Sequence, residues 1–203
     1  MSSARRFRPR KKKRVRTRTS SKRTRKSRTA GAKRRSTDQL LSRPRVAYLG
    51  LGSNVGDRRA HLTAALAEIE SFAPIDCLSS FYSSDPVGYT GQRKFWNAVA
   101  EVRWAGSPEA LLRVVKEIER RGGRRRTFAG GPREIDVDIL DLGGVVRSRR
   151  DPILPHPSLA GRRFALAPLA EIAPEWRHPV SGLTAKQILT TLPQKPGVSR
   201  IRS

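Results

Sequence analysis

The feature that most constrains this chain is a short run of strict alternation, GPREIDVDIL, at residues 131–140. After the Gly-Pro turn, acidic and apolar residues alternate one by one, which is the period of a β-strand with one apolar face. Because side chains two positions apart lie on the same face of a strand, this pattern predicts that Asp136 and Asp138 lie side by side.

The two aspartates are a candidate metal site. Mg²⁺ takes one or two protein carboxylates and completes its shell with water and phosphate, so two adjacent carboxylates on a rigid strand suit it. Arg124, Arg126 and Arg133 flank the strand in sequence, and such cations would favour a metal-bound polyphosphate. The alternative is that the acidic residues are only the solvated face of an amphipathic strand.

Residues 1–45 differ in composition from the rest of the chain. They contain 20 Lys and Arg residues and a single acid, Asp38, and so contribute +19 of the net charge of +26. With almost no apolar side chains to offset chain entropy, this arm is predicted to be disordered and to precede a folded domain at residues 46–203.

The basic arm is open to several interpretations. Its charge predicts non-specific attraction to nucleic-acid phosphates. The alternatives are a solvated tail, residues added by an upstream start codon, or a transit peptide, although the arm is not amphipathic.

Bulk features indicate the compartment. Cys77 is the only cysteine, so no internal disulfide is available and a reducing compartment is expected. No apolar run approaches the ~18 residues of a membrane span, and no secretory signal is evident. We therefore expect a cytoplasmic protein.

The domain alternates between strand and helix patterns. Strands are predicted at residues 46–53, 75–83 and 95–102, in addition to the acidic strand. Helices are predicted after Asp57, with Asn54 as an alternative cap, and after Ser107-Pro108. The order β-α-β-β-α-β predicts an α+β, ferredoxin-like sandwich with additions after residue 141. Neither a P-loop nor a dinucleotide-binding glycine fingerprint occurs.

Four further residues are candidates for function on local grounds. Phe95 and Asn97 share a strand face and could form an aromatic wall beside an amide that binds a heterocycle, although core packing is the alternative for Phe95. Glu119 falls near the apolar stripe of its helix and could project toward the acidic strand. His156 lies between two prolines, which restrict its backbone.

Motifs along the chain resemble one known family. They are LGSN-x-G (51–56), DP-x-G (85–88), NAV (97–99), GR-x-R (123–126), GPR-x-ID-x-DI (131–139), LPHP (154–157) and R-x-F-x-L-x-PL (162–169). In this order they resemble the 6-hydroxymethyl-7,8-dihydropterin pyrophosphokinases of folate biosynthesis, over residues 46–192. The resemblance implies a ferredoxin-like fold and transfer of pyrophosphate from ATP to the pterin hydroxyl, with AMP as the second product.

The resemblance also implies a role for each matching residue. Asp136 and Asp138 would hold two Mg²⁺ ions. The pterin would be bound by Ser84, Pro86, Val87, Phe95, Asn97 and Phe164. ATP would be bound by Glu119, Arg124, Arg126, Arg133, Ile139, Ile153, His156 and Arg162, with Ile139 and Ile153 flanking its adenine. The residues nearest the reacting groups would be Arg124, Arg133, Asp138 and His156.

Two departures from the family pattern accompany this match. The family commonly has a basic residue and then an aromatic residue before the Gly of this loop, and Thr127-Phe128-Ala129-Gly130-Gly131 has neither in that place. Position 95 is Phe where Tyr is frequent. The alternative function is a nucleic-acid-binding protein that acts through the arm and carries a degenerate kinase domain. The residues themselves favour the enzyme, because positioning and charge neutralisation provide most of the catalysis in phosphoryl transfer.

Overall fold

A computed structural model describes residues 43–124, 128 and 130–202. The predictions for most of the basic arm and for Arg126 lie outside these residues. The elements in chain order are β1 (Arg45–Ser53), α2 (Arg58–Glu70), β2 (Ile75–Leu78), β3 (Tyr82–Ser84), β4 (Phe95–Trp104), α3 (Pro108–Arg121), β5 (Asp136–Leu142), the 3₁₀ turn η1 (Leu159–Gly161), α4 (Arg163–Ile172), α5 (Ala185–Thr191) and β6 (Val198–Arg200).

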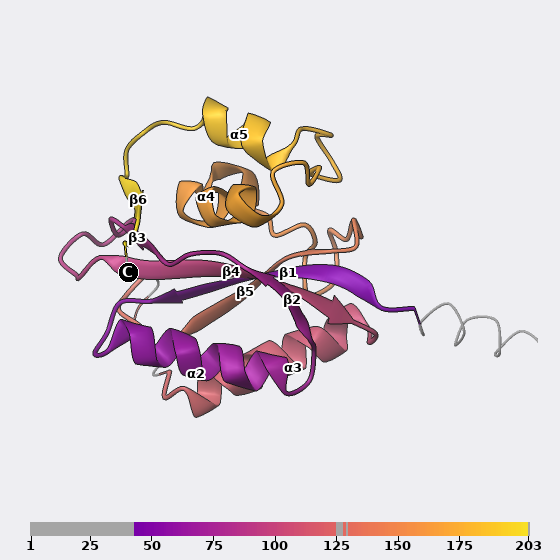
Figure 1. Cartoon of the computed structure of the whole chain (residues 1–203), viewed down its shortest axis with the longest axis horizontal. Coiled ribbons are helices and arrows are strands. Elements are labelled where there is room, and N and C mark those ends of the chain that lie inside the picture. The colour runs from indigo at the N-terminus through magenta and orange to yellow at the C-terminus, as the bar shows by residue number, and fades with distance from the viewer. Residues whose placement is uncertain (1–42, 125–127, 129, 203) are drawn as a thin grey trace, which may run out of the picture.

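The strands form one antiparallel sheet in the order β5-β1-β4-β3-β6, and β2 also pairs with β4. β1 therefore lies between β5, which carries Asp136, Asp138 and Ile139, and β4, which carries Phe95 and Asn97 (Figure 1). The predicted alternation of strands and helices up to the acidic strand is confirmed as an antiparallel sheet with helices between its strands.

The second predicted strand is wrong as a continuous element, because residues 79–81 interrupt it between β2 and β3. Ser79 is the reason. Its backbone N–H donates to the carbonyl of Val99 at 3.0 Å, but the N–H of Val99 donates to the Ser79 hydroxyl at 2.9 Å. A side chain thus takes the place of a backbone carbonyl, and the ladder is broken there. β4, in contrast, runs two residues beyond its predicted end, to Trp104.

Helices α2 and α3 cover one face of the sheet (Figure 1). Asp57 caps α2 by accepting from the N–H of Ala60 at 3.0 Å, and Ser107 caps α3 by accepting from the N–H of Ala110 at 3.1 Å. Both caps agree with the prediction, since short polar side chains satisfy free N–H groups at a helix start. The buried side chains of these helices pack in one cluster with Ile135, Val137 and Ile139.

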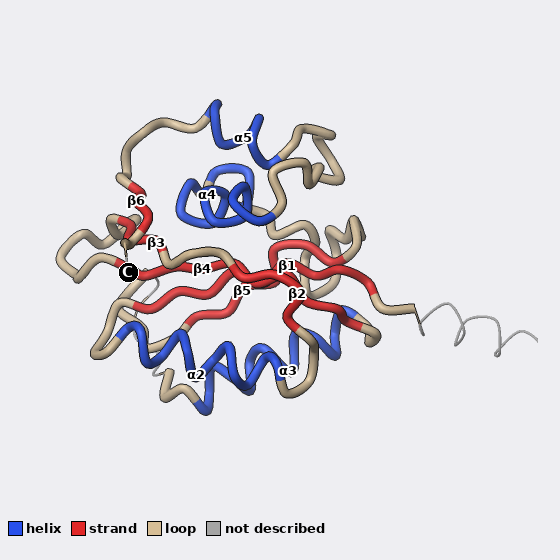
Figure 2. The backbone as a smooth tube through the Cα atoms, in the orientation of Figure 1, coloured by secondary structure: helices blue, strands red, loops and turns tan. Residues whose placement is uncertain are grey.

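Helix α4 covers the opposite face and α5 packs on α4, so the C-terminal additions lie on the other side of the sheet from α2 and α3 (Figure 2). A second core lies there around Leu140, Leu166 and Leu169. Leu140 shares its strand face with Asp136 and Asp138, because side chains alternate along β5. The acidic face is therefore not an open solvated face, and the side chains of Asp136 and Asp138 are only 20% and 30% exposed.

The chain returns to the sheet at its end. β6 pairs with β3 at the outer edge, a contact that the sequence patterns did not predict. The described part of the chain enters β1 from the opposite end of the molecule from β3 and β6 (Figure 1). In the part of the chain that is described, no helix combines the length and apolar character required to span a membrane.

Candidate active site

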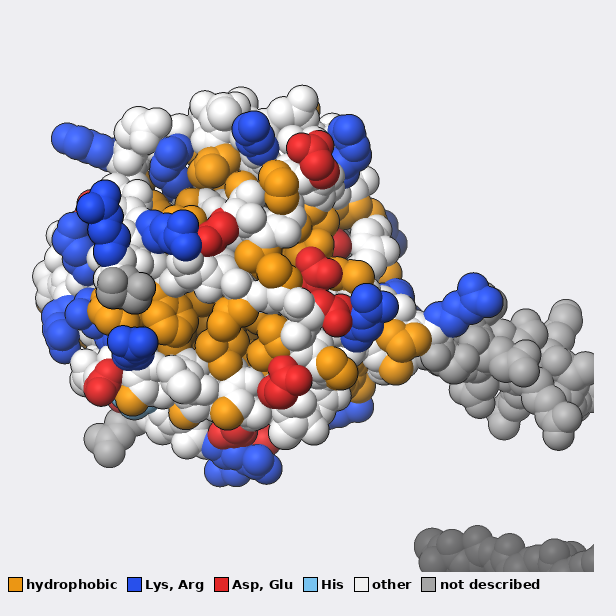
Figure 3. Space-filling model, in the orientation of Figure 1, with side chains coloured by type: hydrophobic (Ala, Val, Ile, Leu, Met, Phe, Trp, Pro, Cys, Tyr) orange, Lys and Arg blue, Asp and Glu red, His pale blue; other side chains and the backbone are white. Residues whose placement is uncertain are grey.

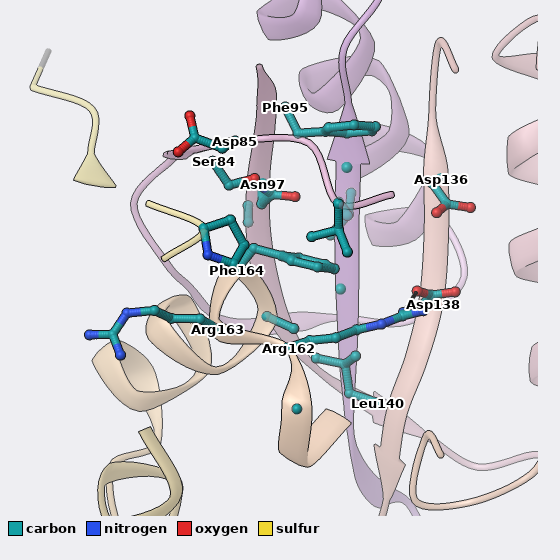
Figure 4. Close-up of a pocket in the computed structure, with 18 of the residues that line it drawn as sticks. Ser84, Asp85, Phe95, Asn97, Asp136, Asp138, Leu140, Arg162, Arg163 and Phe164 are labelled. Carbon is teal, nitrogen blue, oxygen red and sulfur yellow. Dashed lines mark hydrogen bonds and ion pairs between the residues drawn. The ribbon is translucent and has the colours of Figure 1, made fainter. Parts of the chain in front are cut away.

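A cavity of about 470 Å³ lies between the sheet and α4. It is lined by Gly50, Leu51, Gly52, Ser84, Asp85, Val87, Phe95, Asn97, Ala98, Gly130, Arg133, Asp136, Asp138, Leu140, Gly161, Arg162, Arg163, Phe164, Ala165, Leu192, Pro193, Lys195 and Pro196. Figure 4 shows that the carboxylates of β5 lie on one side of it and Ser84, Asn97 and Phe164 on the other. Several Lys and Arg side chains gather at the end of the molecule where β3 and β6 lie (Figure 3).

Asp136 and Asp138 both line this cavity, as their spacing predicts, while Val137 between them is 1% exposed and packs in the core. The pair fits Mg²⁺, which needs only one or two protein carboxylates when phosphate and water supply its other ligands. The described residues contain no group of three or more His, Cys, Asp or Glu side chains suited to a metal. The protein side chains described would therefore provide only part of the ligand shell.

Arginines surround both carboxylates. Arg133 donates to Asp136 at 2.5 Å, Arg124 lies 2.7 Å from the same carboxylate, and Arg162 donates to Asp138 at 3.1 Å. Burial alone would raise the pKa of Asp136, but Arg133 and Arg124 outweigh it and hold that pKa below its ordinary value. The Asp136 carboxylate is thus kept ionised, as a metal ligand requires.

Glu119 lies behind this cluster and is 3% exposed. Its carboxylate accepts from the backbone N–H of Val137 at 2.9 Å and from Lys116 at 2.8 Å, and it contacts Arg124. Burial raises its pKa above the ordinary value, against the opposing effect of these partners. Glu119 thus contacts β5 through Val137, and it contacts Arg124 as well. Its contacts hold Arg124 beside Asp136.

His156 approaches the metal pair from the segment before η1. Its backbone N–H donates to the carbonyl of Leu140 at 2.8 Å, which fixes it against the end of β5. Its Nδ1 accepts from the N–H of Ser158 at 3.2 Å. Nε2 lies 3.8 Å from Asp138 and 3.3 Å from Arg162. Burial lowers the His156 pKa, although Asp138 opposes this shift.

The end of the cavity away from Asp136 and Asp138 has an aromatic wall on each of two sides and polar side chains at its inner edge. The rings of Phe95, from β4, and Phe164, from α4, face each other across it (Figure 4). Asn97, 5% exposed, donates from Nδ2 to the Ser84 hydroxyl at 2.9 Å. Val87 lines the same cavity, whereas Pro86 is not among the lining residues. This end therefore matches a flat heterocycle with a polar edge.

A second cavity of about 210 Å³ lies beside the first. Ile139 and Ile153, predicted to flank adenine, both line it, and so do Lys116, Asp138 and His156. Asp138 is therefore shared by the two cavities.

Sequence reasoning missed part of the larger cavity. Asp85, Arg163 and four C-terminal residues also line it, namely Leu192, Pro193, Lys195 and Pro196. In the sequence, Asp85 was noted only as part of the DP-x-G motif, and the C-terminal residues show no pattern that indicates a chemical function.

Paired carboxylates on a sheet, enclosed by arginines and placed between two cavities, define the class of metal-assisted phosphoryl-transfer sites. The family model described as 7,8-dihydro-6-hydroxymethylpterin-pyrophosphokinase (HPPK) matches residues 48–174. The chain belongs to this family. The comparisons support the enzyme family and give no support to the alternative of a nucleic-acid-binding protein.

Individual relatives support this family assignment. The 2-amino-4-hydroxy-6-hydroxymethyldihydropteridine pyrophosphokinase of Aquifex aeolicus is 41% identical over 133 residues, covering 66% of this chain and 83% of that protein. The enzyme of the same name from Bacillus subtilis is 38% identical over 156 residues, covering 75% and 93%. The folic acid synthesis protein FOL1 of Dictyostelium discoideum is 35% identical, but the match spans 77% of this chain and only 24% of FOL1.

Solved structures give the same fold. The wild-type HPPK-DHPS of Plasmodium falciparum superimposes with a TM-score of 0.58 at 16% identity. The match covers 76% of this chain and 46% of that chain, so this protein spans less than half of the length of its structural relative.

Proposed function

We propose that the protein transfers pyrophosphate from ATP to the hydroxyl of 6-hydroxymethyl-7,8-dihydropterin, giving AMP and the pterin diphosphate in folate synthesis. The observation that carries the proposal is the shared position of Asp138, which lines both cavities. One cavity has facing aromatic rings and a polar edge, as a pterin requires, and the other has the two isoleucines expected beside adenine. The phosphates of a nucleotide in the second cavity would thus reach the pterin in the first.

The metal ions belong to this proposal. Asp136 and Asp138 would hold Mg²⁺, two ions by the family resemblance, and the bound metal would neutralise phosphate charge and orient the chain of phosphates. Arg124, Arg133 and Arg162, which pair with these carboxylates in the structure, would exchange part of that pairing for contacts with phosphate oxygens. Guanidinium groups suit this role because they bind phosphate with two parallel hydrogen bonds.

The remaining residues position the reacting groups. Phe95 and Phe164 would hold the pterin ring between them, while Asn97 and Ser84 would bind its polar edge. The N–H on Nε2 of His156 would donate to a phosphate oxygen beside Asp138. The pterin hydroxyl oxygen would then bond to the β-phosphorus as the bond between that phosphorus and the α–β bridging oxygen breaks. The bridging oxygen would leave on AMP, and the hydroxyl proton would pass to water. Such a reaction needs no protein nucleophile, because alignment and charge neutralisation lower the barrier.

A coupled assay for AMP tests this function. Full-length protein is incubated with ATP, Mg²⁺ and 6-hydroxymethyl-7,8-dihydropterin, and AMP and the pterin diphosphate are measured together. We expect both products in equal amounts, and neither when the pterin is omitted or replaced by 7,8-dihydropterin, which lacks the hydroxymethyl group. AMP formation that does not depend on the pterin would contradict the proposal.

A further inference from the structure

The segment that connects α5 to β6 lies along one side of the larger cavity. Four of its residues line that cavity, namely Leu192, Pro193, Lys195 and Pro196. The segment lies beyond the family match, which ends at residue 174. We call residues 192–197 the C-terminal wall.

Arg163 fixes the start of this wall. Its Nη1 donates to the backbone carbonyls of Leu189 and Leu192, at 3.2 Å in each case. Figure 4 shows that the side chains of Arg162 and Arg163 point in opposite directions. Arg162 extends to Asp138, whereas Arg163 extends away from it. Arg163 therefore lines the cavity but uses its charge to hold the end of α5.

Asp85 fixes the far end of the wall. Its Oδ2 accepts from the backbone N–H of Gly197 at 2.9 Å, and its own N–H donates to the carbonyl of Gly197 at 3.0 Å. Lys94 lies 2.8 Å from the other carboxylate oxygen, where it favours the ionised form. A Cβ at position 197 would lie 3.0 Å from Oδ2, so a glycine is what allows this close approach. β6 follows and pairs with β3.

Each anchor is next in sequence to a predicted pterin-binding residue. Asp85 follows Ser84, whose hydroxyl accepts from Asn97, and Arg163 precedes Phe164, whose ring covers the cavity. The wall thus connects the sheet side of the cavity to the α4 side. Fixing both ends restricts the distance between the two surfaces that would hold the ring, and a preorganised slot loses less free energy when it binds.

We propose that residues 192–197 form a wall of the pterin site and that Asp85 and Arg163 are positioning residues that hold this wall in place. The inference rests on the proposed function, and assigns these residues to pterin affinity rather than to ATP binding. The cavity lined by Ile139 and Ile153 contains none of them.

Two variants and two matched controls test the inference in the full-length protein. Asp85→Ala and Arg163→Ala remove the anchors. Asp76→Ala removes a comparable surface ion pair, with Arg103 at 2.6 Å, and Arg177→Ala removes a comparable hydrogen bond to a carbonyl, that of Gly182 at 3.1 Å. Both controls lie outside the residues that line the two cavities.

Pterin affinity is measured by calorimetry with Mg²⁺ and a non-hydrolysable ATP analogue, and by the KM for each substrate. We expect the Kd and KM for the pterin to rise about tenfold in each anchor variant, which corresponds to one lost hydrogen bond of ordinary strength. The KM for ATP should change less than about twofold, and the controls should match the wild type. Gly197→Ala should raise the pterin Kd as well, because its Cβ displaces the Asp85 carboxylate.

Other results overturn the inference. Unchanged pterin affinity in both anchor variants would show that the wall does not contribute to the site. An equal rise in the KM for ATP and for the pterin, together with a lower midpoint of thermal unfolding, would show a general structural role. Failure of the wild type to bind the pterin would instead refute the proposed function, so the two failures are distinguishable.

Discussion

Arg162 donates to Asp138 at 3.1 Å, and this contact joins the start of α4 to β5 across the cavity. The same guanidinium lies 5.6 Å from the centre of the Phe164 ring. One arginine therefore connects the carboxylate end of the cavity to its aromatic end, and both substrates of the proposed reaction would approach it.

The metal pair is tested by Asp136→Asn and Asp138→Asn. Both variants should lower turnover with Mg²⁺ by roughly a hundredfold or more, because a neutral amide is a poor ligand and the metal provides several kcal/mol of charge stabilisation. Asn is preferred to Ala because these side chains are partly buried and paired with arginines. The measurement is AMP formation, with the thermal midpoint as a check of folding.

Asp76→Asn is the matched control for the metal pair, since Asp76 also pairs with an arginine but lies on β2 outside both cavities. It should leave turnover unchanged. If either metal-pair variant is folded and keeps near-normal turnover, the assignment of the metal site is wrong.

His156→Ala should raise the activation barrier by roughly 1.5–3 kcal/mol, the range of a hydrogen bond to a charged group. The reason is the loss of Nε2, which faces Asp138 and Arg162 and would contact phosphate there. Steady-state kcat/KM for ATP measures the change. A variant with normal kinetics but a lower thermal midpoint would show that His156 only packs against β5.

Glu119→Ala should lower the free energy of unfolding by about 2–3 kcal/mol, because it leaves the N–H of Val137 without its acceptor and removes a charged hydrogen bond from Lys116. Glu119→Gln keeps an acceptor for Val137 and should lose less. Urea unfolding of the two variants, compared at equal m-values, measures the difference. Equal losses of unfolding free energy in the two variants would mean that the charge of Glu119, and not its hydrogen bond to Val137, stabilises the fold.

Deletion of residues 1–42 should leave kcat within about twofold of the full-length value, as is usual for changes remote from a site. The described chain begins at the end of the molecule opposite to β3 and β6, whereas the cavity includes Ser84 and Asp85 near β3 (Figure 1). The turnover numbers of the full-length protein and of the protein without residues 1–42 test this prediction. A collapse of turnover on deletion would mean that the division of the chain at residue 46 is wrong.

Local patterns in the sequence determined much of this molecule. Alternation placed Asp136 and Asp138 on one face of β5, and short polar residues capped α2 and α3 at Asp57 and Ser107. Such predictions succeed because the period of side chains along a strand or helix depends only on neighbouring residues. The position of Glu119 near the apolar stripe belongs to the same class of inference.

Tertiary structure alone decided what covers the acidic face and what closes the cavity. Asp85 holds Gly197 across 112 positions of sequence, and Arg162 pairs with Asp138 across 24. No periodicity encodes these contacts, because they depend on how α4, α5 and β6 pack on the sheet after its strands have paired. A sequence pattern determines which face of an element is apolar or charged. Which partner meets that face is decided only when the layers assemble.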